Sequence, residues 1–284
     1  MTFASLYPLT AALSSLVSVQ VGAVFAKTLF PQVGPEGVAA LRLGIAAFIL
    51  VLWLKPWTLS LGRSNGWALL GYGTVMAMMN LLIYRAFATI PVGIAISIEV
   101  LGPLGVALIS SHRRLDVLWV YFALVGVALL PLGSVNGSLD LPGLGYAALA
   151  GVFWGLYVIV GKKTAPLGAR GVALGMSVAA LLVVPLGVAH AGMGLLSPEV
   201  LLLGGLIALL SSAMPFLLDM SALKHLPRHV FGVLMSASPA VSAMAGQWVL
   251  GEHLNFLQWL GIGAITAACL GSALSTQAVA RQDG

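Results

Sequence analysis

The chain repeats itself once, and each half holds an odd number of apolar segments. A shift of 136 places lays Pro91 on Pro227, Pro103 on Pro239, and Asp116 on Glu252. Five spans per half would make the second half enter a membrane with the opposite orientation. Many secondary transporters are built on that inverted-topology plan. The repeat therefore indicates a carrier for a small solute.

Composition supports a membrane location. Of the 284 residues, 60% are hydrophobic and 7% are charged, whereas soluble domains carry roughly 25% charged residues. The net charge of +5 comes from basic residues that fall in connecting loops, so membrane topology explains it better than a nucleic-acid partner does. A single cysteine, Cys269, excludes an intrachain disulfide and a cysteine-based metal cluster. We expect neither a metal nor a cofactor.

Ten mainly apolar stretches are each long enough to cross a ~30 Å hydrocarbon core as a helix. They cover residues 8–28, 36–54, 66–88, 91–110, 116–133, 142–162, 169–190, 199–222, 228–249 and 256–276. We therefore predict an all-α integral membrane protein with ten transmembrane helices, arranged as two inverted five-helix repeats around a central cavity. The expected repeats are residues 1–138 and 139–284.

The distribution of Lys and Arg predicts the orientation. If the amino terminus is inside, ten basic residues lie in inner segments, and only Lys27 and Arg85 lie at outer span ends. Cytoplasmic loops carry such an excess of Lys and Arg. Both termini are therefore expected to face the cytoplasm, and the protein is expected in the plasma membrane, which is the inner membrane of a cell with two.

Several sequence segments resemble a known family. They are residues 40–44 (ALRLG), residues 92–113, the Trp154-Gly155 pair, and the run from Ser211 to Glu252. The whole chain resembles the drug/metabolite transporter superfamily with two EamA repeats, and within it most closely the bacterial threonine/homoserine exporters. Val21-Gly22 departs from the Trp-Gly pair often found in the first half. The resemblance implies a basket of ten helices, with four from each half around the cavity and the fifth of each packed outside.

Charged residues within the spans are candidates for lining that cavity. A charge in the bilayer is costly and is kept facing the bundle interior or water. Glu99 lies about eight residues into its span, hence ~12 Å deep at 1.5 Å per residue, and its repeat counterpart is Met235. It could handle substrate or protons, or it could pair with Arg42 or Arg85 and only hold helices together. For Asp219, a salt bridge with Lys224 at a helix end or gate is the favoured interpretation.

Three prolines point to the same region. Pro103, Pro239 and Pro215 each lack an N–H, so the carbonyls four residues earlier lose their helical donors. Broken helices in corresponding positions of two repeats indicate a binding site near the midplane. Simple kinks that help the helices curve are the alternative.

Polar and aromatic residues complete the predicted site. Gln20 and Asn80 suit a wet pocket, or they hold helices together; Trp154 and Tyr157 suit a pocket wall, or they are plain packing. The expected substrate-binding residues are Gln20, Arg42, Asn80, Tyr84, Glu99, Trp154, Tyr157, Phe216, Met235 and Ser238. The expected gate or helix-break residues are Pro103, Pro215, Asp219 and Pro239.

The predicted function is export of small amino acids and related metabolites by alternating access. Threonine-like and homoserine-like substrates fit the resemblance, the coupling ion, if any, is the proton, and we expect a monomer in the bilayer. Aromatic amino acids or drugs are alternative cargoes. A membrane-embedded enzyme is a further alternative, but it requires a convergent set of acids or histidines, and the sequence shows only isolated ones. A non-transporting assembly subunit would not need buried charge at the midplane.

Overall fold

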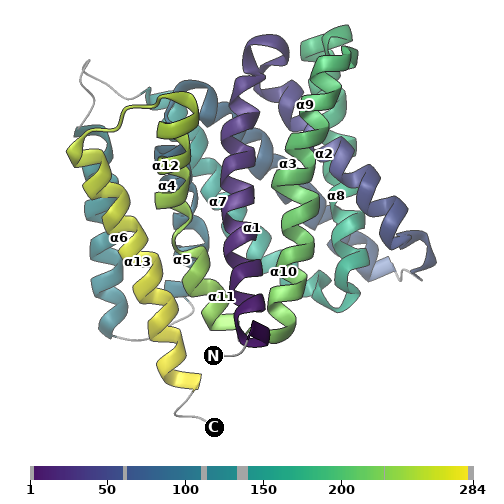
Figure 1. The fold of residues 1–284 in the computed structure, drawn as a ribbon. Coiled ribbons are helices and arrows are strands. Elements are labelled where there is room, and N and C mark those ends of the chain that lie inside the picture. The colour runs from purple at the N-terminus through teal and green to yellow at the C-terminus, as the bar shows by residue number, and fades with distance from the viewer. Residues whose placement is uncertain (1–2, 60–62, 110–113, 133–139, 227, 281–284) are drawn as a thin grey trace.

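The computed structural model describes residues 3–59, 63–109, 114–132, 140–226 and 228–280, and these contain helices but no strand. The helices are α1 (Phe3–Thr28), α2 (Phe30–Leu54), α3 (Arg63–Thr89), α4 (Val92–Glu99), α5 (Leu101–Ile109), α6 (Arg114–Leu132), α7 (Leu141–Thr164), α8 (Gly168–Ala191), α9 (Pro198–Ala208), α10 (Met214–His225), α11 (Arg228–Met235), α12 (Ser238–Leu250) and α13 (Phe256–Ala280). Short 3-10 turns η1 (Pro56–Thr58), η2 (Ala165–Leu167) and η3 (Gly192–Leu196) join some of them, and a π-helical segment, η4 (Leu209–Ala213), joins α9 to α10. Figure 1 shows them standing side by side in one bundle.

The prediction of an all-helical multi-pass membrane protein is confirmed. Eight stretches of the described chain are long and apolar enough to cross a membrane. One of them, Leu141–Leu196, contains both α7 and α8, and Val117–Leu132 is a shorter apolar helix. The ten-span arrangement stays a prediction. Its expected boundary between halves, at residues 138–139, lies outside the described residues, as do Arg113 and Arg281 of the basic-residue count.

Two of the expected spans are interrupted at their middle. The span over residues 91–110 divides into α4 and α5 on either side of Val100, and the span over 228–249 divides into α11 and α12. Each break lies just before a proline, Pro103 or Pro239, as expected where a helical N–H is missing. Both α4 and α11 have eight residues, and they coincide under the 136-residue shift.

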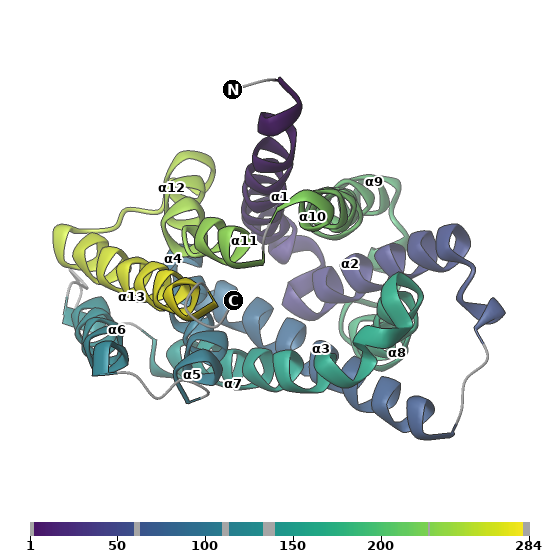
Figure 2. The same ribbon diagram turned by 90° about the horizontal axis from the view of Figure 1, so that it is seen from below.

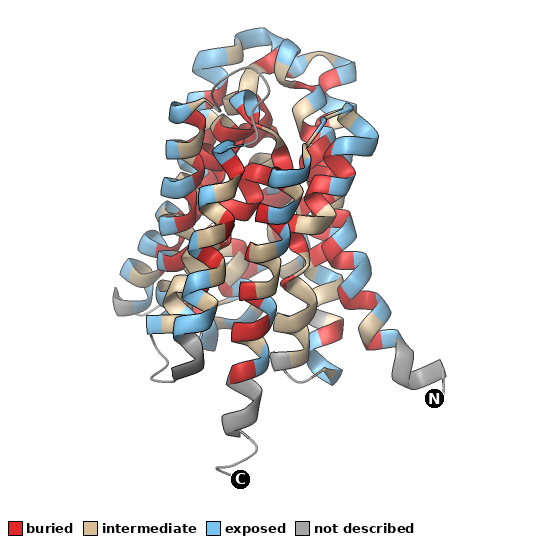
Figure 3. Cartoon of the chain, turned by 90° about the vertical axis from the view of Figure 1, so that its left-hand side faces the viewer, coloured by how far each residue is buried: buried red, intermediate tan, exposed pale blue. Residues whose placement is uncertain are grey.

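The helices pack in pairs that bring distant parts of the chain together. α3 packs along α7, α1 along α10, α2 along α8, and α6 along α13. Figure 2, seen from below, shows the α6–α13 pair at one edge of the bundle, outside the other helices. Figure 3 shows buried residues gathered on the inner faces and exposed ones on the outer faces. Because many exposed residues are large and apolar, such as Phe48 and Leu181, the outer faces suit lipid.

Glycines allow α5 and α7 to approach at the interrupted span. A Cβ on Gly151 would lie 2.8 Å from the Glu99 carbonyl oxygen, and a Cβ on Gly102 would overlap the Gly151 carbonyl. Small residues in lipid permit this close backbone contact. The Gly151–Gly155 spacing thus lies on a real helix contact, and it supports the backbone next to Glu99.

We predict that Gly102→Ala destabilises the protein, because its methyl group cannot fit against the Gly151 backbone without moving α5 or α7. Thermal unfolding of the purified protein in detergent measures this, and Gly102→Ala should lower the midpoint. Gly105→Ala is the matched control: it lies on the same helix, and nothing lies within 4 Å of its Cβ position. Equal midpoints for the two variants would contradict the close contact.

Candidate functional site

Three adjoining cavities run through the bundle, and we name them by their residues. The deep cavity, about 140 Å³, is lined by Val19, Gln20, Ala23, Arg42, Met79, Asn80, Ile83, Tyr84, Phe87, Ile96, Glu99 and Trp154. The middle cavity, about 240 Å³, shares Arg42 and Asn80 with it and adds Tyr157, Phe216 and Asp219. The vestibule, about 390 Å³, shares Tyr157 and Phe216 with the middle cavity and extends to Ala165 and Gly168.

The cavities define two different ends of the bundle. Figure 1 places the beginning of α1 and the end of α13 at the same, lower end, which we call the terminal end. The vestibule opens there, since it is lined by the turn that follows α7, and Ala165 and Gly168 in that turn are exposed. The three cavities therefore follow one another from the terminal end to Glu99, near the break between α4 and α5.

Arg42 on α2 stands between the deep and middle cavities. Its Nη1 donates to Asn80 Oδ1 at 2.9 Å, its Nε to Ser212 Oγ at 3.2 Å, and its Nη2 to the Ser211 carbonyl at 3.1 Å. The guanidinium carbon also lies 5.7 Å from the centre of the Tyr84 ring, within range of a cation–π contact. These contacts join α2 to α3 and to the π-helical segment.

The bond from Arg42 to Ser211 follows from the proline four residues later. Pro215 has no N–H to donate to the Ser211 carbonyl, and the chain there takes the wider π-helical turn. The arginine supplies a donor in its place. Ser238 does the same at the break between α11 and α12, because its hydroxyl donates to the Met235 carbonyl at 2.8 Å. Side chains therefore replace the missing helical donors at the Ser211 and Met235 carbonyls.

The deep cavity holds polar groups that lack protein partners. Glu99 is 6% exposed and belongs to none of the ion pairs found among the described residues. Gln20 and Tyr84 are also buried, and Gln20 Oε1 and the Tyr84 hydroxyl have no hydrogen-bond partner in the described part of the chain. Buried polar groups without partners are rare in native structures, so this cluster favours a polar ligand.

Two expected pairings are wrong. The interpretation that Glu99 pairs with an arginine fails for Arg85, whose Nε lies 2.8 Å from Glu36 Oε1 and whose guanidinium faces Tyr146. Arg42 donates its hydrogen bonds to the neutral oxygens described above; it lines the same cavity as Glu99 and interacts with that carboxylate through its charge, without an ion-pair contact. Asp219 forms no ion pair with Lys224 in the described chain; it lines the middle cavity, and its Oδ1 is buried without a partner.

The aromatic residues divide between the cavities. Trp154 lines the deep cavity, whereas Phe216 and Tyr157 lie where the middle cavity meets the vestibule. The Tyr157 hydroxyl accepts a 2.6 Å hydrogen bond from Tyr72, and the two rings stack with centres 4.8 Å apart. Sequence reasoning missed Tyr72, although it lies eight residues before Asn80 and therefore near the same face of α3.

The remaining predicted residues lie at the helix breaks. Pro215 lines the middle cavity, whereas Met235, Ser238, Pro103 and Pro239 are not among the residues that line these three cavities. The structure therefore brings eight of the ten predicted binding residues to the connected cavities. Met235 and Ser238 instead form the second break.

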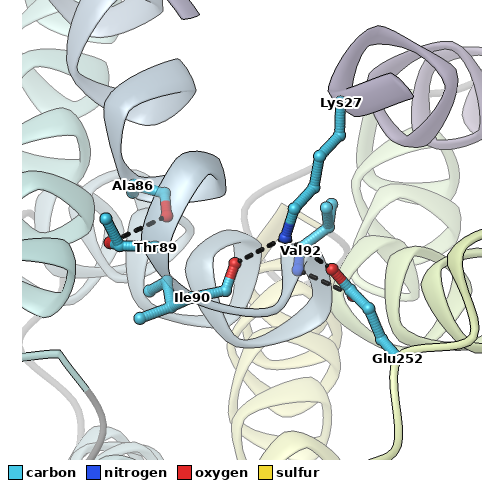
Figure 4. A network of polar contacts seen from close by, with 6 residues as sticks. All are labelled: Lys27, Ala86, Thr89, Ile90, Val92 and Glu252. Atoms are coloured by element: carbon cyan, nitrogen blue, oxygen red, sulfur yellow. Dashed lines mark hydrogen bonds and ion pairs between the residues drawn. The ribbon is translucent and has the colours of Figure 1, made fainter. Parts of the chain in front are cut away.

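An ion pair joins three segments of the bundle at the end opposite the termini (Figure 4). Lys27 Nζ lies 2.7 Å from Glu252 Oε1 and donates to the Ile90 carbonyl at 3.1 Å. Glu252 Oε2 accepts from the Val92 N–H at 3.0 Å. Figure 4 shows these contacts joining α1, the turn between α3 and α4, and the segment between α12 and α13. We call Lys27 and Glu252 with these two backbone groups the Lys27 latch.

We predict that Arg42→Met destabilises the protein and that Pro215→Ala offsets part of the loss. The single variant leaves the Ser211 carbonyl without its donor, at a cost of about 1 to 3 kcal/mol. In the double variant, the alanine that replaces Pro215 provides an N–H for that carbonyl, so the two changes should be non-additive. Unfolding midpoints of the two single variants and the double variant measure this. Additive losses would contradict the link between Arg42 and the proline.

Comparison with known proteins gives consistent matches. The model of the EamA-like transporter family matches residues 141–274. The chain is 43% identical over 272 residues to a protein of Escherichia coli (strain K12) named threonine/homoserine exporter RhtA, with 95% of this chain and 92% of that protein covered. A protein of the same name from Salmonella typhimurium (strain SL1344) is 43% identical over 270 residues, covering 94% of this chain and 92% of its own length. A chain of known crystal structure, 19% identical, superposes with a TM-score of 0.59 over 97% of this chain and 99% of its own.

Proposed function

Because the chain belongs to the EamA-like transporter family, we propose that it exports small amino acids such as threonine and homoserine by alternating access. The observation that carries the proposal is the deep cavity, where a buried carboxylate, Glu99, and a partly buried guanidinium, Arg42, line one space. An amino acid carries one charge of each sign. In the cavity, the Glu99 carboxylate can bind the ammonium group and the Arg42 guanidinium can bind the carboxylate of the substrate.

The proposed pose follows from which groups are already engaged. Glu99 forms no ion pair among the described residues, although Arg42 lines the same cavity, so it receives the substrate ammonium group. Arg42 has five N–H groups and donates to three protein acceptors, which leaves donors for the substrate carboxylate. The unpartnered Gln20 Oε1 and Tyr84 hydroxyl are then available to a polar side chain such as that of threonine.

Cavity size favours a small substrate over an aromatic or drug-like one. The deep cavity of about 140 Å³ holds roughly four or five water molecules at ~30 Å³ each. Pockets for drug-sized ligands occupy about 300 to 1,000 Å³. A short amino acid fits the space between Glu99 and Arg42, whereas a larger cargo would extend into the middle cavity.

The packing supports two inverted five-helix repeats. Under the 136-residue shift, α1 corresponds to α7, and α3 corresponds to α9 with α10. The packing of α3 against α7 is therefore the repeat counterpart of the packing of α1 against α9 and α10. The α2–α8 and α6–α13 pairs each join a helix to its own repeat counterpart. With cytoplasmic termini in the bacterial inner membrane, the vestibule opens inward and the Lys27 latch closes the outside. We assign the state as inward-open.

We predict that reporter fusions after residues 60, 114, 166, 226 and 280 read cytoplasmic. Fusions near residues 33, 137, 195 and 253 should read external, because basic residues collect at the terminal end. Alkaline phosphatase, active only outside, and green fluorescent protein, fluorescent only inside, measure the two classes. Two or more contradictory fusions would overturn the inverted arrangement.

We predict that Glu99→Gln strongly reduces transport without unfolding the protein. The amide keeps shape and hydrogen bonding but removes the charge that meets the ammonium group, and interactions with charged groups are worth roughly 1.5 to 3 kcal/mol. Counterflow of labelled threonine in liposomes should fall by about tenfold or more, with the unfolding midpoint nearly unchanged. Glu199→Gln, at an exposed carboxylate in the first turn of α9, is the matched control and should transport normally.

The same variant separates the alternatives. Normal counterflow in Glu99→Gln would remove Glu99 from substrate binding. Transport that persists but loses its dependence on a pH gradient would assign Glu99 to protons rather than to the ammonium group. If a panel of labelled solutes shows counterflow of phenylalanine but not of threonine, the small-substrate assignment fails.

A further inference from the structure

The middle cavity is lined by the same three positions of both sequence repeats. These residues are Met76, Met79 and Asn80 and, under the 136-residue shift, their counterparts Ser212, Pro215 and Phe216. Equivalent faces of the two repeats therefore meet across this cavity. In transporters built from inverted repeats, substrate sites lie at the interface between the repeats. The middle cavity has that position, although the pose proposed above uses the deep cavity.

The middle cavity contains two opposite charges that do not pair with each other. Among the described residues that line it, only Arg42 and Asp219 carry a charge. Neither takes part in an ion pair found in the described chain. Asp219 Oδ1 is buried and has no hydrogen-bond partner there. Because buried polar atoms without partners are rare in native structures, this carboxylate favours a ligand that brings a donor.

The spacing of the two charges suits a molecule that joins them. Arg42 Nε donates to Ser212 Oγ, and Asp219 follows Ser212 by seven residues. Seven residues span ~10 Å along a helix at 1.5 Å per residue. Figure 1 shows α10 running toward the terminal end, so Asp219 lies on the vestibule side of Arg42. An α-amino acid with a hydrogen bond of about 2.9 Å at each end bridges a gap that is too wide for a direct ion pair.

The deep cavity has its own carboxylate on the other side of Arg42. Glu99 lines the deep cavity but not the middle one, whereas Asp219 lines the middle cavity but not the deep one. Arg42 lines both. The repeat counterpart of Asp219 is Ile83, which lines the deep cavity, so this position faces a cavity in both repeats. One cation thus stands between two acids along the row of cavities.

We propose that the middle cavity is a second substrate subsite, in which Asp219 binds the ammonium group of a zwitterionic amino acid and Arg42 binds its carboxylate. This rests on the export function proposed above, and it adds the binding step that comes before the deep cavity. The substrate enters from the vestibule and keeps its carboxylate on Arg42. Its ammonium group then passes from Asp219 to Glu99.

The donors of Arg42 limit the two subsites to alternate occupancy. Three of its five N–H groups are used by protein acceptors, and the two that remain match a single carboxylate. One substrate molecule therefore occupies either the middle or the deep subsite. Because charge is costly to bury in a membrane, a carboxylate that stays bound throughout the transfer lowers the cost of moving the ammonium group.

Protection of a thiol by substrate shows whether the middle cavity is occupied. Cys269 is buried and is replaced by Ala. Val172→Cys then provides a reporter in the wall shared by the middle cavity and the vestibule. The purified protein in detergent is labelled with a maleimide at increasing concentrations of threonine. Glu99→Gln is added to remove the carboxylate of the deep cavity, which confines bound threonine to the middle one.

We predict that threonine still slows labelling in the Glu99→Gln protein. Adding Asp219→Asn should raise the threonine concentration for half-protection by about tenfold or more, because a hydrogen bond to a charged group is lost. Asp140→Asn is the matched control and should leave protection unchanged, since the same substitution there falls at the N-cap of α7, which asparagine also caps. Unfolding midpoints check that each variant is folded.

Two threonine analogues test the same contacts without changing Asp219. Threoninamide lacks the carboxylate, and N-acetylthreonine lacks the ammonium group. Each should need a concentration at least about tenfold higher than threonine for half-protection of the Glu99→Gln protein. Protection by either analogue at the threonine concentration would overturn a subsite that binds both charges.

Two further results would also overturn the second subsite. They are no protection by threonine in the Glu99→Gln protein, and an unchanged half-protecting concentration after Asp219→Asn, which would assign Asp219 to protons if the pH dependence of transport were lost instead. Counterflow separates these failures from a failure of the proposed function. If protection depends on Asp219 but labelled threonine shows no counterflow in the parent protein, the subsite stands and the export of threonine fails. Threonine counterflow with protection that does not depend on Asp219 gives the reverse.

Discussion

The requirement that backbone polar groups find partners away from water governs the interior of this protein. Where a proline removes a helical donor, a carbonyl must be satisfied by something else. Arg42 binds the Ser211 carbonyl, and the Ser238 hydroxyl binds the Met235 carbonyl. Arg42 is thereby placed between the deep and middle cavities. The hydrogen bond from Arg42 to the Ser211 carbonyl replaces a missing helical bond, and it also holds the guanidinium at the cavity where a substrate would lie.

Close packing next to the cavity depends on residues without side chains. The backbone at Glu99 faces Gly151, and Gly102 meets the Gly151 backbone. Helix α4 approaches α12 in the same way, because a Cβ on Gly93 would lie 2.5 Å from Ala243. These contacts hold the interrupted span in place. Glu99 therefore has a fixed position at the cavity wall without an ion pair to anchor it.

Hydrophobic length and proline spacing were enough to predict the helices and the interrupted spans. Charged, polar and aromatic residues within the spans predicted eight of the residues that line the cavities. These signals depend on residues that are close together in the sequence, so they can be read from one sequence alone. The ion pairs between helices could not be predicted. Arg85 forms an ion pair with Glu36 on α2, and Asp219 lines the middle cavity instead of binding Lys224. For each of these charged residues the sequence offers several possible partners of opposite charge, and only tertiary packing decides which of them lies close by. The sequence shows Lys27 and Glu252 but gives no sign that they form an ion pair, because 225 residues separate them.

The two halves of the sequence repeat are more alike at the latch and proline positions than at the cavity. Lys27, Pro91, Pro103 and Glu252 have counterparts of like chemistry at Lys163, Pro227, Pro239 and Asp116. The cavity residues do not: the counterparts of Gln20, Arg42, Asn80 and Glu99 are Leu156, Val178, Phe216 and Met235. The proposed alternating access needs two states of similar free energy, and matched contacts at the two ends would provide that. An amino acid has a different charge at each end, so recognising it at one central site requires unlike halves. A repeat that is alike at these positions and unlike at the cavity meets both requirements of the proposed function.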